Sequence, residues 1–161
     1  MTLIISVTST ELDGPRKEAR RLESIIAQEK VEAVVVPGAC LPEILQSWGV
    51  RHLPVFRINE VAVWEGEKPP ADLVRSWLHW PKTLEEAVQR LLASVPDIPD
   101  DPLANHEIGT AIRNSFGLWG ANKELLRSCG SELMPADDAF DIILNAARTV
   151  LREQKRGDRN K

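Results

Sequence analysis

Two runs of apolar, mostly β-branched residues, 2–8 (TLIISVT) and 31–37 (VEAVVVP), constrain the fold of this chain more than any other feature. Such runs, with few polar interruptions, are typical of parallel strands that are buried on both faces of a sheet. Between them, residues 14–30 place apolar side chains at helical spacing among charged ones. Because neighbouring parallel strands need a crossover of this length, the chain is predicted to begin with a right-handed β-α-β unit.

The next segment predicts two more strands and two more helices. They are a short helix at 41–47, strands at 54–58 (PVFRI) and 61–65 (VAVWE), and a helix at 69–78. Only Asn59 and Glu60 separate the two strands, which is typical of an antiparallel hairpin. The predicted order up to residue 78 is therefore β-α-β-α-β-β-α.

After residue 80 the strand-like runs end and only helical spacing remains. Thr83 and Glu86 have the spacing of a capping box at the start of a helix. The expected segments are helices at 83–92, about 103–115, 122–128 and 136–154, a loop at 94–102, and a frayed polar tail at 156–161. The chain is thus predicted to hold an α/β domain over 1–79 and an all-helical domain over 80–155.

Two motifs give the first domain a resemblance to the thioredoxin family. Asp13-Gly14-Pro15-Arg16 stands at the start of the first helix, where that family has Cys-Gly-Pro-Cys. The segment Gly49-Val50-Arg51-His52-Leu53-Pro54 is similar to the family segment that ends in a cis-proline. The resemblance implies a thioredoxin-like fold over 1–78, which begins at the central strand of that family, and a cis peptide bond before Pro54.

The departure from the family pattern argues against its chemistry. Thiol–disulfide exchange needs an attacking thiolate and a second thiol, whereas Asp13 and Arg16 supply a carboxylate and a guanidinium. We expect no oxidoreductase activity of this kind unless Cys40 reacts alone. Asp13 is interpreted as the N-cap of the helix or as a partner contact, and Arg16 as a solvated side chain or a partner contact.

Pro54 suggests a binding role without chemistry. A cis-proline there would leave the backbone groups of Leu53 free to pair with an extended peptide, as in β-augmentation. The alternative is that Pro54 only shapes the start of the strand.

The second domain resembles a bacterial family of small helical domains of unknown function, over most of 80–152. The segments that carry the resemblance are PKTLEEAVQRLL (81–92), HEIGTAIRNSFGLW (106–119), LLRSCG (125–130) and PADDAFDIIL (135–144). The resemblance implies no activity, but it draws attention to Arg113, Asn114 and Trp119.

Two interpretations of these residues stay open. Arg113 and Asn114, with Asp137 and Asp138, either recognise an anionic group or form an interhelical salt bridge and loop hydrogen bonds. The aromatic and apolar residues nearby are expected in the core; these are Phe116, Leu118 and Trp119.

Charge and residue content argue against several classes of protein. The net charge of −4 is spread over both halves, so no basic face for nucleic acid is expected. No apolar run approaches the roughly 18 residues of a membrane span, and we expect a cytoplasmic protein. Cys40 and Cys129 form no CxxC pair, and there are only three His, so neither a metal site nor a cofactor is expected.

The sequence favours a non-catalytic protein-binding module, such as an adaptor, a regulatory subunit or an immunity-type inhibitor. Its candidate partner-binding residues are Asp13, Arg16, Leu53, Pro54, Arg113, Asn114 and Trp119. The alternative is a glutathione-binding enzyme of glutathione-transferase-like architecture, with Ser9 or Thr10 near the activating position. A structural oligomer is a third possibility, since the chain has five Trp and no Tyr.

Overall fold

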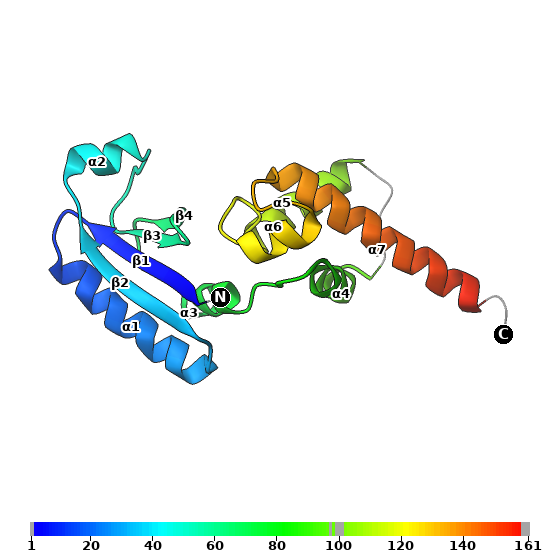
Figure 1. Ribbon diagram of the computed structural model, residues 1–161, viewed down its shortest axis with the longest axis horizontal. Helices are drawn as coiled ribbons and strands as arrows, with labels where there is room; N and C mark the ends of the chain where they lie inside the picture. Colours follow the sequence, from blue (N-terminus) through cyan, green and yellow to red (C-terminus); the bar gives the residue numbers. More distant parts are fainter. Residues whose placement is uncertain (1, 97, 99–101, 159–161) are drawn as a thin grey trace. The chain divides into compact units, whose positions relative to one another are not determined.

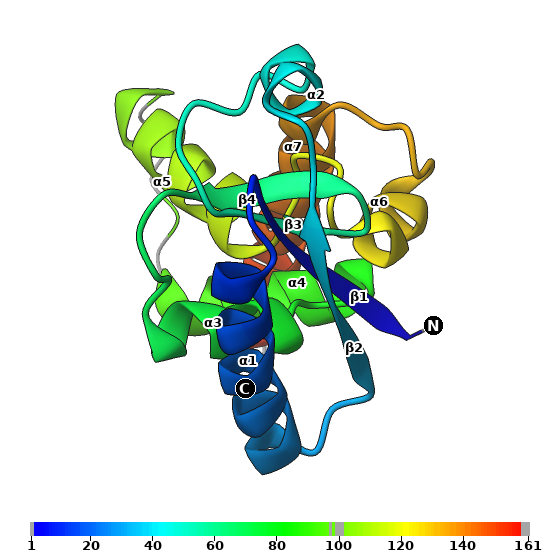
Figure 2. The same ribbon diagram turned by 90° about the vertical axis from the view of Figure 1, so that its left-hand side faces the viewer.

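The computed structural model describes residues 2–96, 98 and 102–158, and the chain divides into two compact units, Met1–His79 and Trp80–Lys161. Within the described residues the first unit has four strands and three helices, and the second unit has four helices. They are labelled in Figures 1 and 2. The elements of the first unit are β1 (Leu3–Ser9), α1 (Asp13–Glu29), β2 (Ala33–Ala39), α2 (Pro42–Ser47), β3 (Val55–Ile58), β4 (Val61–Glu65) and α3 (Ala71–Leu78). The predicted order of elements is confirmed.

The four strands form one mixed sheet in the order β2-β1-β3-β4. β1 pairs with β2 in parallel, as the crossover helix requires, and β3 is antiparallel to both β1 and β4. The hairpin turn consists of Asn59 and Glu60, whose φ angles of 49° and 73° are both left-handed. This is the conformation of a type I′ turn, so the predicted tight hairpin is confirmed.

One face of the sheet forms the core of the first unit. Ile5 and Val7 are fully buried there, and α1 packs against β1, β2 and α3. On the opposite face Ile4, Val34 and Val36 are about half exposed, at 49%, 50% and 46%. The prediction of two buried strands is therefore wrong for this face, because Ile4, Val34 and Val36 are exposed there, whereas Ile5, Val7 and Val35 are buried on the other face.

Over its described residues the second unit consists of helices packed around an apolar core. Its helices are α4 (Leu84–Ser94), α5 (Pro102–Ser115), α6 (Lys123–Cys129) and α7 (Ala136–Asp158). Thr83 Oγ1 accepts a hydrogen bond from the Glu86 N–H (3.2 Å), which confirms the predicted cap. The expected loop at 94–102 falls partly on residues 97 and 99–101, outside the described residues.

The sequence analysis placed the start of the frayed tail too early, at residue 156. α7 continues through 156–158, and its last turn holds Lys155 and Arg156, where positive charge is favourable at a helix C-terminus. The remainder of that tail, 159–161, lies outside the described residues. Among the helices that the structure describes, none combines the length and apolarity needed to cross a membrane.

A buried asparagine ties the start of the second unit to its core. Asn122 is 6% exposed, and its Nδ2 donates to the carbonyls of Pro81 (2.8 Å) and Phe116 (2.9 Å). Its Oδ1 accepts from the Leu125 N–H (3.2 Å) and so caps α6. One side chain therefore satisfies three backbone groups of three segments.

We predict that Asn122→Ala lowers the free energy of unfolding of the helical unit by about 2–4 kcal/mol, because two buried carbonyls and a helix N-terminus lose their partner. Urea unfolding followed by circular dichroism measures the change. Asn145→Ala, at an exposed position of α7, is the matched control and should stay within about 0.5 kcal/mol of the wild type. Equal effects of the two substitutions would contradict the role given to Asn122.

An ionic cluster joins the last turn of α1 to the last turn of α3. The Glu29 carboxylate accepts from His79 Nε2 (2.9 Å) and from Arg75 Nε (3.0 Å). The hydrogen bond from His79, helped by Arg75, outweighs partial burial and holds the pKa of Glu29 below its ordinary value of 4.5. The folded state therefore favours the ionised form of Glu29.

This shift predicts a pH dependence of stability with a definite sign. The contribution of Glu29 is present above its ordinary pKa and is lost as the pH falls through the lowered pKa of the folded state. Between about pH 6 and about pH 3, the wild type should lose more free energy of unfolding than Glu29→Gln. Urea titrations at both pH values test this, and parallel losses in the two proteins would refute the linkage.

Candidate functional site

The motifs that resemble the thioredoxin family lie at one end of the sheet. In the β1–β3 ladder Thr8 pairs with Val55, so the end of β1 lies beside Pro54. The peptide bond between Leu53 and Pro54 is cis, as expected. The Cys40 N–H, just after β2, donates to the Ser9 carbonyl at the same end (2.9 Å).

The structure corrects the role of Asp13. The N-cap of α1 is Leu12, which makes no side-chain cap hydrogen bond, and Asp13 is the first helical residue. The predicted N-cap role of Asp13 is therefore wrong, although its carboxylate in the first turn still suits the helix dipole. Asp13 and Arg16 are both exposed, so they are accessible at the sheet end that holds Pro54.

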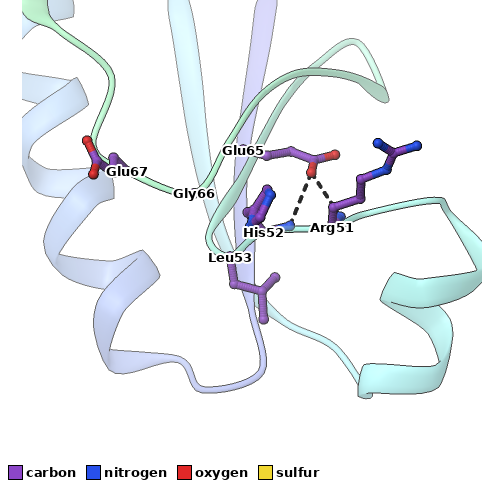
Figure 3. A pocket seen from close by; sticks show the side chains of 6 residues that line it. All are labelled: Arg51, His52, Leu53, Glu65, Gly66 and Glu67. Carbon is purple, nitrogen blue, oxygen red and sulfur yellow. Dashed lines mark hydrogen bonds between the residues drawn. The ribbon is translucent and has the colours of Figure 1, made fainter.

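The segment before Pro54 is fixed by the end of the β3–β4 hairpin. One oxygen of the Glu65 carboxylate accepts from the backbone N–H groups of Arg51 (2.9 Å) and His52 (3.2 Å). Figure 3 shows this carboxylate above the two amides, with the Leu53 side chain on the other side of the segment. The Gly66 N–H donates to the Pro54 carbonyl (2.9 Å).

Gly66 is required by geometry at this point. Its φ of 85° is left-handed, and a Cβ built there would lie 3.2 Å from the Cβ of His52. Because Gly66 has no side chain, the end of the β3–β4 hairpin can approach His52 closely and hold the segment before Pro54.

Next to this segment lies an open pocket of about 670 Å³. It is lined by Arg51, His52, Leu53, Glu65, Gly66 and Glu67. Leu53 is 39% exposed, and within the described part of the chain its backbone N–H and C=O have no hydrogen-bond partner. These two groups are therefore free to pair with an extended peptide.

We predict that Glu65→Ala loosens this segment, because two backbone amides lose a charged acceptor. In hydrogen–deuterium exchange the amides of Arg51 and His52 should exchange at least about tenfold faster, which corresponds to about 1.4 kcal/mol. Glu67→Ala is the control, since that carboxylate lines the same pocket without accepting either amide. Unchanged exchange at both amides in Glu65→Ala would contradict this role.

A second cluster brings together the three candidate residues of the helical unit. Asn114 Oδ1 accepts from the Trp119 indole N–H (2.8 Å). The Arg113 guanidinium lies 5.7 Å from the centre of the Trp119 ring. Trp119 is nevertheless 57% exposed, so its prediction as a core residue is wrong, while Phe116 and Leu118 are buried as predicted.

Arg113 also joins α5 to α7. It is 8% exposed, and its Nη1 pairs with the Asp137 carboxylate (3.0 Å) while Nη2 donates to Thr110 Oγ1 (3.2 Å). A Cβ at Gly109 would lie 2.9 Å from Nη1, so this glycine leaves room for the guanidinium. The interhelical salt bridge, one of the two open interpretations, is thus present, and Asp137 is the carboxylate that forms it.

The two cysteines are free and both half-buried. Burial raises the pKa of the Cys129 thiol, which disfavours its reactive thiolate form. Over residues 2–96, 98 and 102–158, no group of three or more His, Cys, Asp or Glu side chains is arranged to hold a metal ion.

Sequence reasoning missed Glu65, the residue that fixes the segment before Pro54. Its signal is weak, because it acts on backbone groups of residues 51 and 52 and no motif marks such a contact.

Comparisons with known proteins give no family for this chain. No protein-family model matches it, and no curated protein has a similar sequence. The pocket at Leu53 and the Trp119 cluster are therefore the features on which a function can be proposed.

Proposed function

We propose that this chain is a non-catalytic protein-binding module, with a thioredoxin-like first unit that captures an extended peptide at Leu53. The order of elements and the sheet order β2-β1-β3-β4, with β3 antiparallel to the rest, are compatible with that fold. Asp13 and Arg16 replace the two cysteines of the family pattern, so the scaffold is retained without thiol chemistry.

The observation that carries the proposal is the free backbone of Leu53. Glu65 and Gly66 hold the neighbouring residues, so the N–H and C=O of Leu53 are presented in a fixed conformation. A preorganised backbone segment lowers the entropy cost of pairing with a peptide. The pocket beside it offers Arg51 and Glu67, of opposite charge, to side chains of the bound peptide.

Two further features support partner binding. Asp13 and Arg16 are exposed at the sheet end that holds Leu53. In the helical unit, Trp119 is exposed yet fixed by Asn114 and Arg113, and tryptophan and arginine are enriched among residues that dominate binding energy. An adaptor, a regulatory subunit and an immunity-type inhibitor all fit this arrangement.

We predict that a partner captured by a photo-crosslinking amino acid at position 53 binds at least about tenfold more weakly to Leu53→Arg than to the wild type. The charged side chain would obstruct the peptide path at an exposed position, so the fold should persist. Glu60→Arg, in the exposed hairpin turn, is the control for added charge. The double variant Asp13→Ala, Arg16→Ala tests in the same assay whether the start of α1 also contributes to partner binding.

Backbone pairing has its own readout. In the complex the Leu53 amide should become protected from hydrogen exchange, because its N–H is then donated to the peptide. The proposal would be refuted by a partner that binds Leu53→Arg as tightly as the wild type and leaves the Leu53 amide of the wild type unprotected in the complex.

A glutathione-binding enzyme is the second candidate, since the backbone of a tripeptide can also pair with Leu53. Ser9 and Thr10, near the start of α1, would then face the thiol. A rise of the Tm with millimolar glutathione, lost in Leu53→Arg, would favour this candidate over protein capture.

A further inference from the structure

The backbone of segment 51–54 can pair with a peptide through one residue. The two N–H groups before Leu53 already donate to the Glu65 carboxylate (2.9 and 3.2 Å), and Pro54 has no N–H. Of these four described residues, Leu53 alone therefore has a free N–H. In an antiparallel pair, one residue exchanges both hydrogen bonds with the residue opposite it. The side chains of a bound peptide must then supply most of the specificity.

Two charged side chains line the pocket beside Leu53 and are open to a ligand. Within the described part of the chain, neither the Arg51 guanidinium nor the Glu67 carboxylate makes a hydrogen bond or an ion pair, and both residues are exposed. Glu65, the third charged residue of the lining, differs because its carboxylate already accepts two backbone amides. Arg51 and Glu67 are thus the charges that the pocket offers to a bound segment.

The backbone is fixed at both of these charges. The Arg51 N–H is held by Glu65 (2.9 Å), and the Glu67 carbonyl accepts from the Trp64 indole N–H (2.6 Å). Figure 3 shows Arg51 and Glu67 on opposite sides of Leu53. Opposite charges therefore flank the residue that pairs with a peptide, and the fold sets their order.

The direction of pairing converts this order into a peptide sequence. An antiparallel peptide runs opposite to 51–53, so its N-terminal half lies on the side of Glu67 and its C-terminal half beside Arg51. Opposite charges on facing strands stabilise each other. We propose that the segment captured at Leu53 carries a basic residue before its paired residue and an acidic residue after it. This inference rests on the proposed capture of an extended peptide and names the class of peptide.

Selection of random peptides displayed on phage, against the full chain, tests the charge order. The wild type should enrich peptides with Lys or Arg before a central residue and Asp or Glu after it. Arg51→Glu should change the second preference to basic, and Glu67→Lys should change the first to acidic. Arg20→Glu, at an exposed position of α1, is the control for reversed charge and should leave the order unchanged.

A synthetic peptide from the wild-type selection gives the size of the effect by calorimetric titration. Arg51→Glu in the protein, or Lys in place of the acidic residue of the peptide, should each weaken binding about twofold to fivefold, and the two changes together should restore it. If Arg51→Glu lowers the Tm, Arg51→Gln removes the charge without adding a carboxylate beside Glu65 and should abolish the acidic preference. N-methylation of each peptide amide in turn should weaken binding most at the residue between the two charges.

The two proposals fail in different ways. If no peptide binds the wild type more tightly than it binds Leu53→Arg, peptide capture itself is wrong, and this inference is wrong with it. Peptides that need Leu53 but show no charge order, or the reverse order, would overturn the inference alone. So would an order that the substitutions at Arg51 and Glu67 leave unchanged.

Discussion

The parallel pairing of β1 with β2 is the constraint on which the rest of the first unit depends. It requires α1 as a crossover, and α1 then buries Ile5 and Val7 on one face of the sheet. The same central strand pairs on its other side with β3, and that register carries the end of β1 to the level of Pro54. The position of the candidate peptide site thus follows from how two apolar strands are joined.

Much of the fold could be predicted because apolar periodicity reports local geometry well. The order of strands and helices, the hairpin at Asn59 and the cap at Thr83 all follow from local signals. The half exposure of Val34 and Val36 was not predictable in the same way, since a run of valines indicates that a surface is apolar but not whether anything covers it. The end of α7 was placed too early because its last residues are polar, although their charges favour a helix C-terminus.

The candidate site could be predicted only in part. Leu53 and Pro54 belong to the segment 49–54, which resembles a known motif. Glu65 acts on backbone amides that are distant in sequence, and no motif marks such a contact. Trp119 was expected in the core from the spacing of its neighbours. The left-handed turns at Gly117 and Gly120 reverse the chain around it and leave the ring at the surface.

The boundary between the two units has a consequence for how the chain can be divided. Trp80 is buried, and its ring fills the space left by Gly117, where a Cβ would come within 2.7 Å of it. The next residue, Pro81, receives the hydrogen bond from Asn122. Both residues therefore belong to the architecture of the helical unit, and no spacer separates them from His79. A gene fragment for that unit alone has to begin at codon 80. A start three codons later would remove the Trp80 ring that packs against Gly117 and would expose apolar residues of the helical unit.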